Sequence, residues 1–152
     1  MDRINKIENF AKQKYEEAQM RETKMNQQIE EYKQQIRMLK PRIDELLEVG
    51  NACLEHSIPL TGRGWGCHEG YDTHQFITNG WSHLLGFVKN HSQATFTKLG
   101  IEGGGACNYN LETDGDMINV TGDKCYVLKK FVDNFDRFES EFYKYVDKVT
   151  GQ

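Results

Sequence analysis

Apolar residues recur at alternating intervals of three and four between residues 29 and 53, with Gly50 the only interruption. On a helix, an average interval of 3.5 residues produces a narrow apolar row that is stabilised when it packs against a second helix. We therefore predict a helix here whose row faces another helix. The row contains Ile29, Tyr32, Ile36, Leu39, Ile43, Leu46 and Cys53.

A second row of the same spacing lies near the C-terminus and is rich in aromatic residues. Asp123 is a suitable N-cap because its carboxylate can accept a free backbone N–H, and Gly151 suits a helix end. We predict a helix from about residue 123 to residue 149 that packs antiparallel on residues 29–53. Its row contains Leu128, Phe131, Phe135, Phe138, Phe142, Tyr145 and Val149.

The first 56 residues are rich in helix-forming residues and contain no glycine before Gly50. Pro41 interrupts them, because proline inside a helix removes a hydrogen bond and costs about 3 kcal/mol. Two interpretations remain: one helix kinked at Pro41, or two helices with Pro41 at the start of the second. We prefer the kinked helix, because the apolar row keeps its phase from Leu39 to Ile43.

Towards the N-terminus the row weakens. It continues as Ile4, Ala11, Ala18 and Met25, and its companion positions are Glu8, Tyr15 and Glu22. The C-terminal helix is long enough to cover only residues 29–53, so the first 28 residues must project, fold back or meet another chain. The alternative is that these 28 residues form a solvated helix end that has no partner. We expect self-association into a homo-oligomer, with Ile4, Ala11, Ala18 and Met25 as the contact residues.

Residues 57–121 differ in composition, since they hold 11 of the 14 glycines and four of the five histidines. Both features favour strands and tight turns over helix. An Asp114-Gly115 turn predicts a hairpin that pairs Leu111 with Ile118 and Tyr109 with Val120. Residues 58–75 are predicted to form a loop, because four glycines lie between residues 61 and 70.

A second hairpin is predicted from residues 81–88 and 94–101, with Phe87 opposite Phe96 and Leu84 opposite Leu99. The two hairpins together would form an antiparallel sheet of about four strands. The predicted fold class is therefore α+β, with this small sheet inserted between two long antiparallel helices. We expect one compact domain with a projecting arm. Its three segments are a helical arm (1–56), a Gly/His-rich β region (57–121) and a C-terminal helix (122–152).

Charge, apolar runs and cysteine spacing limit the classes of protein to which this chain can belong. The net charge is −4 and no segment is basic, so the electrostatics argue against binding to nucleic acid. The chain has no apolar run long enough for a transmembrane helix or a signal peptide. Its four cysteines are widely spaced without a Cys-x-x-Cys pair, which suggests reduced thiols in a cytoplasmic protein.

We therefore expect a non-enzymatic interaction protein that self-associates through its N-terminal helix and binds an unidentified protein partner. The partner would meet a loop surface rich in glycine, histidine and aromatic residues, because exposed aromatic side chains often anchor interfaces. The residues predicted for this surface are Arg63, Trp65, His68, Tyr71 and His74.

The alternative is a metal- or small-molecule-binding protein, or a hydrolase, centred on Cys67 and the nearby histidines. Zinc takes four thiolate or imidazole ligands, and the candidates here are Cys53, His56, Cys67 and His74. The sequence Gly64-Trp65-Gly66-Cys67 also resembles the nucleophile segment of the autophagy-type and ubiquitin-fold-modifier cysteine proteases. That family has a downstream Asp-Pro-His, which this chain lacks, so the resemblance assigns no family.

Overall fold

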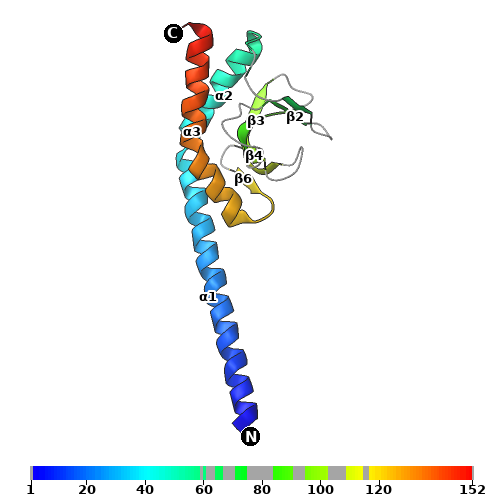
Figure 1. The fold of residues 1–152 in the computed structure, drawn as a ribbon, viewed down its shortest axis with the longest axis vertical. Coiled ribbons are helices and arrows are strands. Elements are labelled where there is room, and N and C mark those ends of the chain that lie inside the picture. The colour runs from blue at the N-terminus through cyan, green and yellow to red at the C-terminus, as the bar shows by residue number, and fades with distance from the viewer. Residues whose placement is uncertain are drawn as a thin grey trace.

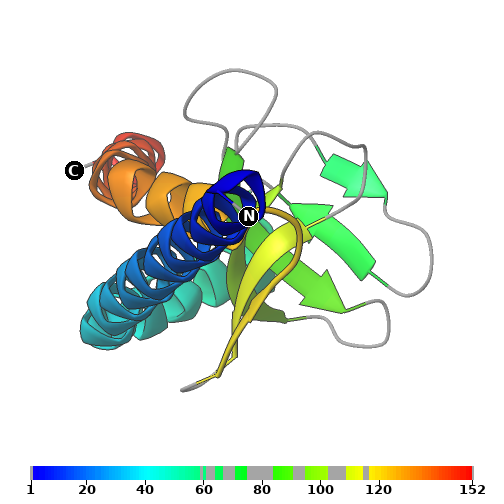
Figure 2. The same ribbon diagram turned by 90° about the horizontal axis from the view of Figure 1, so that it is seen from below.

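The computed structural model describes residues 2–58, 60, 64–66, 71–74, 84–90, 95–102, 109–114 and 117–151. Three helices and six strands are assigned in these ranges, and all strands belong to one antiparallel sheet. The fold is therefore α+β, as predicted. Figures 1 and 2 show the helices grouped on one side and the sheet on the other, with the N-terminal part of the first helix projecting beyond both.

The long N-terminal segment forms two helices, α1 (Asp2–Met38) and α2 (Lys40–Glu55), which is the second of the two interpretations. Leu39 separates them, and Pro41 lies in the first turn of α2. Pro41 has no N–H to donate, and its ring crowds the carbonyl of Arg37, so the regular helix ends before it. The Leu39 N–H still donates to the Gln35 carbonyl of α1 at 3.2 Å, and the Ile43 N–H donates to the Leu39 carbonyl at 2.9 Å, so Leu39 is bonded to both helices.

The strands follow one another across the sheet in the order β1-β2-β3-β4-β5-β6. The predicted count of about four strands is not confirmed, because the described strands number six. Residues 58–75 are also not all loop, since β1 and β2 lie within them; three or four residues are too few to show a strand period. The strands are β1 (Gly64–Gly66), β2 (Tyr71–His74), β3 (Leu84–Asn90), β4 (Phe96–Glu102), β5 (Tyr109–Asp114) and β6 (Met117–Val120).

The β5–β6 hairpin has a register two residues away from the predicted one. Leu111 pairs with Val120, and Thr113 pairs with Ile118. A shift of two residues leaves every side chain on its predicted face, because the side-chain period of a strand is two. On the other side of β5, the buried Thr113 hydroxyl donates to the Leu99 carbonyl of β4 at 3.2 Å, which joins the hairpin to the rest of the sheet.

The β3–β4 pair also differs from its predicted register. Phe87 lies opposite Leu99 rather than Phe96, and Leu84 lies opposite Glu102. The register shifts between Val88 and Lys89, which an alternating pattern does not reveal. The predicted turn residues Gly115 and 91–93 lie outside the described residues, so those turns stay predictions.

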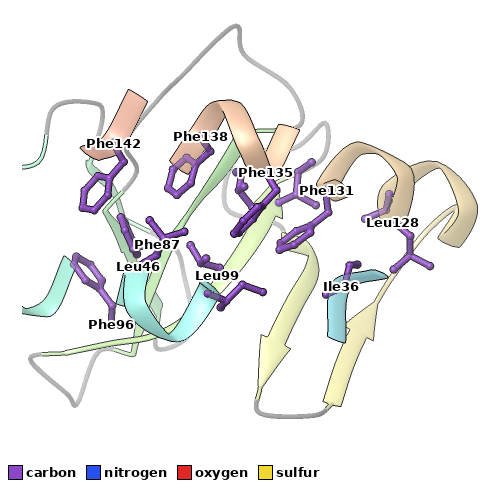
Figure 3. Close-up of a cluster of buried hydrophobic side chains, with 14 residues drawn as sticks. Ile36, Leu46, Phe87, Phe96, Leu99, Leu128, Phe131, Phe135, Phe138 and Phe142 are labelled. Carbon is purple, nitrogen blue, oxygen red and sulfur yellow. The ribbon is translucent and has the colours of Figure 1, made fainter. Parts of the chain in front are cut away.

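The C-terminal helix α3 (Lys124–Thr150) begins after the N-cap Asp123, whose carboxylate accepts the Tyr126 N–H at 3.1 Å. It ends at Gly151, which has a φ of 80°. Both boundaries agree with the prediction. Figure 3 shows the aromatic row of α3 directed towards β3, β4 and α2.

The predicted antiparallel packing of α3 is wrong, because α3 runs in the same direction as α1 and α2 (Figure 1). Near the start of α3, the Cys125 thiol lies 3.7 Å from the Met25 carbonyl oxygen. Further along both segments, the Arg42 guanidinium bonds to Glu139 at 2.6 Å. Figure 1 shows that the sheet extends from β2, near the level of α2, to β6, near the start of α3. The strands therefore bring the chain back along the helices before α3 begins.

The core lies between the helices and the sheet (Figure 3). Phe87 is its centre, since its ring lies 4.9 Å from that of Phe96 and 5.0 Å from that of Phe142. Gly50 interrupts the apolar row because a Cβ there would come within 3.0 Å of the Phe87 ring. The fully buried members are Ile36, Leu46, Leu85, Phe87, Leu99, Ile101, Leu128, Phe131, Phe135, Phe138 and Phe142.

Candidate functional site

The apolar row of α1 is covered along only part of its length. Ile36 is 1% exposed within the core, and Ile29 and Tyr32 pack against the same cluster. Figure 3 shows Ile36 beside Leu128 and Phe131 of α3. From residue 29 onwards, α3 therefore occupies the apolar face of α1.

The same face continues uncovered towards the N-terminus. Between Asp2 and Gln28 every side chain except that of Glu17 is exposed. At 100° per residue, seven apolar or small residues fall within about 140° of the helix circumference. We call this set the arm stripe; it consists of Ile4, Ile7, Phe10, Ala11, Tyr15, Ala18 and Met25.

All four residues predicted for oligomerisation belong to the arm stripe, and all four are exposed. Ile4 and Met25 are each 53% exposed. Ile7 and Phe10, which are 66% and 61% exposed, also belong to the arm stripe but were not among the predicted contact residues. The spacing in the sequence could have identified Ile7, because it lies three residues after Ile4 and four before Ala11, and therefore on the same face of the helix. Met20, in contrast, projects from the opposite side of the helix.

Polar side chains of the arm bond mainly along the helix. Gln19 donates to the Tyr15 hydroxyl at 3.0 Å, and Lys14 lies 3.5 Å from Glu17. The Lys14 ammonium also lies 5.3 Å from the centre of the Phe10 ring. These exposed contacts contribute little to stability, and they leave the aliphatic side chains of the arm stripe open.

The covered and uncovered parts of the row meet where α3 begins. The Cys125 thiol approaches the Met25 carbonyl oxygen at 3.7 Å and the Gln28 side-chain oxygen at 4.0 Å. A groove of about 530 Å³ lies at this junction. It is lined by Arg21, Lys24, Met25, Gln27, Gln28, Glu31, Asp123 and Cys125.

The loop surface predicted from sequence is described only in part. Trp65 lies in β1 opposite Thr73, while Tyr71 and His74 lie in β2 opposite Asn90 and Phe87 of β3. The backbone pairing therefore brings three of the five residues into two neighbouring strands, the edge strand β1 and the strand β2 beside it. The other two, Arg63 and His68, lie outside the described residues.

The predicted zinc ligands are not brought together by the described part of the chain. Cys53 is 3% exposed within the core, and burial raises the pKa of its thiol, which disfavours the thiolate that zinc requires. His56 is exposed at the end of α2. His74 lies in β2, and Cys67 lies outside the described residues. Within the described ranges, no three His, Cys, Asp or Glu residues form a metal-binding group.

None of the described helices combines the length and the apolar character that spanning a membrane requires. Comparison with protein families, with curated proteins and with solved structures gives no match to this chain.

Proposed function

We propose that this protein is a non-enzymatic interaction protein that self-associates through the arm stripe of α1. The observation that supports this proposal is the continuity of the apolar face. One part of the row packs on α3, and the other part projects with Ile4, Ile7, Phe10, Tyr15 and Met25 more than half exposed. Covering apolar surface stabilises a complex by about 25 cal/mol per Å².

A second copy of the chain is the proposed occupant of the stripe. It presents the same narrow row, and two such rows can interlock as in a coiled coil. Ala11 and Ala18 are small enough to let a second helix approach closely. Within the assembly, strands β1 and β2, with Trp65, Tyr71 and His74, would remain available for a protein partner, since they lie on the sheet and not on the arm.

The test is the solution mass of the full chain and of two matched variants, measured by sedimentation equilibrium. We expect the unaltered protein to have at least twice the 17.7 kDa mass of one chain. Ile7→Lys places a charge in the arm stripe and should shift the equilibrium to monomer. Met20→Lys makes the same chemical change on the opposite side of the helix and should leave the mass unchanged.

Two results would reject the proposal. One is an unaltered protein that stays monomeric at the highest concentration measured. The other is an equal loss of association in both variants, because the arm stripe would then have no special role. Circular dichroism of each variant verifies that the helices remain folded.

A further inference from the structure

The position of α3 limits how a second arm can lie on the first. From residue 29 onwards, α3 covers the face of α1 that carries the apolar row, with Phe131 against Ile36, and the first residues of α3 reach the Met25 carbonyl oxygen through Cys125. The uncovered part of the row extends from Ile4 to Met25. A partner helix on this face must therefore end its contact near Met25.

A parallel partner in register does not satisfy this limit. Its own residues 29–38 would lie along residues 29–38 of the first chain, on the face that α3 already fills. It would also bring Glu8 against the partner's Glu8 and Glu22 against the partner's Glu22, because identical residues meet in a parallel pair. Like charges at such positions destabilise the pair.

An antiparallel partner avoids both conflicts. We propose that two arms pair antiparallel about a two-fold axis between Lys14 and Tyr15, with Ile4 of one chain at the level of the partner's Met25. Ala11 then lies at the level of the partner's Ala18, so both small residues occur near the centre. This inference rests on the proposed self-association and specifies its geometry.

The charges of the arm agree with this register. In this register Glu8 lies at the level of the partner's Arg21, and Glu22 lies at the level of the partner's Ile7. The like-charge contacts of the parallel pair therefore do not arise, and the two-fold axis repeats each of these levels. Charge patterns of this kind favour one orientation over another more than they add affinity.

The contact between the two arms ends at the groove beside the start of α3. In the antiparallel arrangement the first turn of the partner's arm reaches the level of Met25, where the groove of about 530 Å³ lies between α1 and Cys125. The partner's Ile4 would cover Met25 there. The covered row would then continue without a gap from the partner's arm to α3.

Photo-crosslinking in the full chain tests the orientation. Phe10→p-benzoylphenylalanine keeps an aromatic side chain at the site, and Ile4→p-benzoylphenylalanine places the same probe at the end of the stripe. Benzophenone inserts into nearby C–H bonds and reacts readily with methionine. Mixing isotopically labelled with unlabelled protein identifies the adducts that join two chains.

We expect the probe at position 4 to join the partner near Met25, and the probe at position 10 to join it near residues 18–22. Adducts at the partner's own residues 1–14 from both positions would overturn the antiparallel arrangement but leave self-association intact. A monomeric mass with no adduct between chains would reject the self-association itself. A dimeric mass with no adduct from either position would place the interface elsewhere and overturn both proposals.

Discussion

At the scale of single residues, Gly50 shows how one missing side chain permits the central ring cluster. Its position would place a Cβ 3.0 Å from the Phe87 ring and 3.2 Å from the Phe96 ring. Alanine would favour the helix by about 1 kcal/mol, but moving two stacked rings in a filled core costs about 1–3 kcal/mol. We expect Gly50→Ala to lower the free energy of unfolding by about 1 kcal/mol, measured by urea denaturation.

Glu48→Ala provides the control, because Glu48 is exposed on the same helix. It should change the free energy of unfolding by less than about 0.5 kcal/mol. If Gly50→Ala proved more stable than the unaltered protein, the rings would have room to move, and the close approach would not explain the glycine.

Tyr143 provides a prediction about pH. Burial, followed by the charges of Glu45 and Glu139, raises the pKa of its hydroxyl to about 12 from 10.0. The folded state therefore holds this proton more tightly than the unfolded state does, so its contribution is present below pH 10.0 and is lost as the pH rises towards about 12. We expect the free energy of unfolding to decrease over this interval.

Tyr143→Phe tests that contribution. The hydroxyl oxygen is buried without a hydrogen-bond partner, so its removal should raise the free energy of unfolding at neutral pH by about 1 kcal/mol. It should also make the decrease above pH 10.0 less steep. Equal slopes in the two proteins would show that Tyr143 does not titrate differently on folding.

At the scale of elements, Arg42 joins α2 to α3. Its guanidinium donates to both Glu139 carboxylate oxygens, at 3.0 and 2.6 Å, and to Asp136 at 2.7 Å, and it lies 4.8 Å from the centre of the Phe135 ring. Such paired geometry makes Arg42 the strongest ionic contact between these helices in the described ranges, although the site is partly exposed.

A double-mutant cycle measures that contact. Arg42→Ala and Glu139→Gln should each destabilise the protein, and their coupling should be about 1 kcal/mol, as for a partly exposed ion pair with good geometry. Arg42→Lys should recover only part of the loss, because an ammonium cannot bond to both oxygens in one plane. Full recovery by lysine would show that charge alone matters.

The sequence predicted elements better than it predicted their pairing. The apolar rows located the helices, and Asp123 and Gly151 located the ends of α3. The strand registers were missed for a physical reason. In the β5–β6 hairpin, a shift of two residues keeps positions 111 and 120 on the same face, so alternation cannot distinguish the two registers. In the β3–β4 pair, the register shift between Val88 and Lys89 leaves no mark in the alternating pattern.

At the scale of the whole molecule, the direction of α3 was not available from the sequence. A row such as Phe131, Phe135 and Phe138 has the same spacing in either direction, so it predicts a helical partner without an orientation. The orientation depends on where the sheet ends relative to α1, which is a tertiary property that no local pattern records. The arm stripe was predictable because Ile4 and Met25 continue a row that Ile29 begins.

Hydrogen exchange should report the state of the arm. Amides within residues 2–24 have only their helical hydrogen bonds and would exchange quickly in a monomer. If the arms pair, protection of these amides should increase with protein concentration, while protection of α3 should stay constant. Ile7→Lys should remove the concentration dependence and Met20→Lys should retain it, as measured by mass spectrometry.

The parallel direction of α3 has a consequence for how the chain reaches its native state. Two antiparallel helices can begin to associate at a short turn, but here Met25 and Cys125 come together across 100 residues of chain. Closing so long a loop early costs conformational entropy that few contacts would repay. The sheet must therefore form before α3 docks or together with it, so folding should be limited by strand pairing and slower than in a helical bundle of this size.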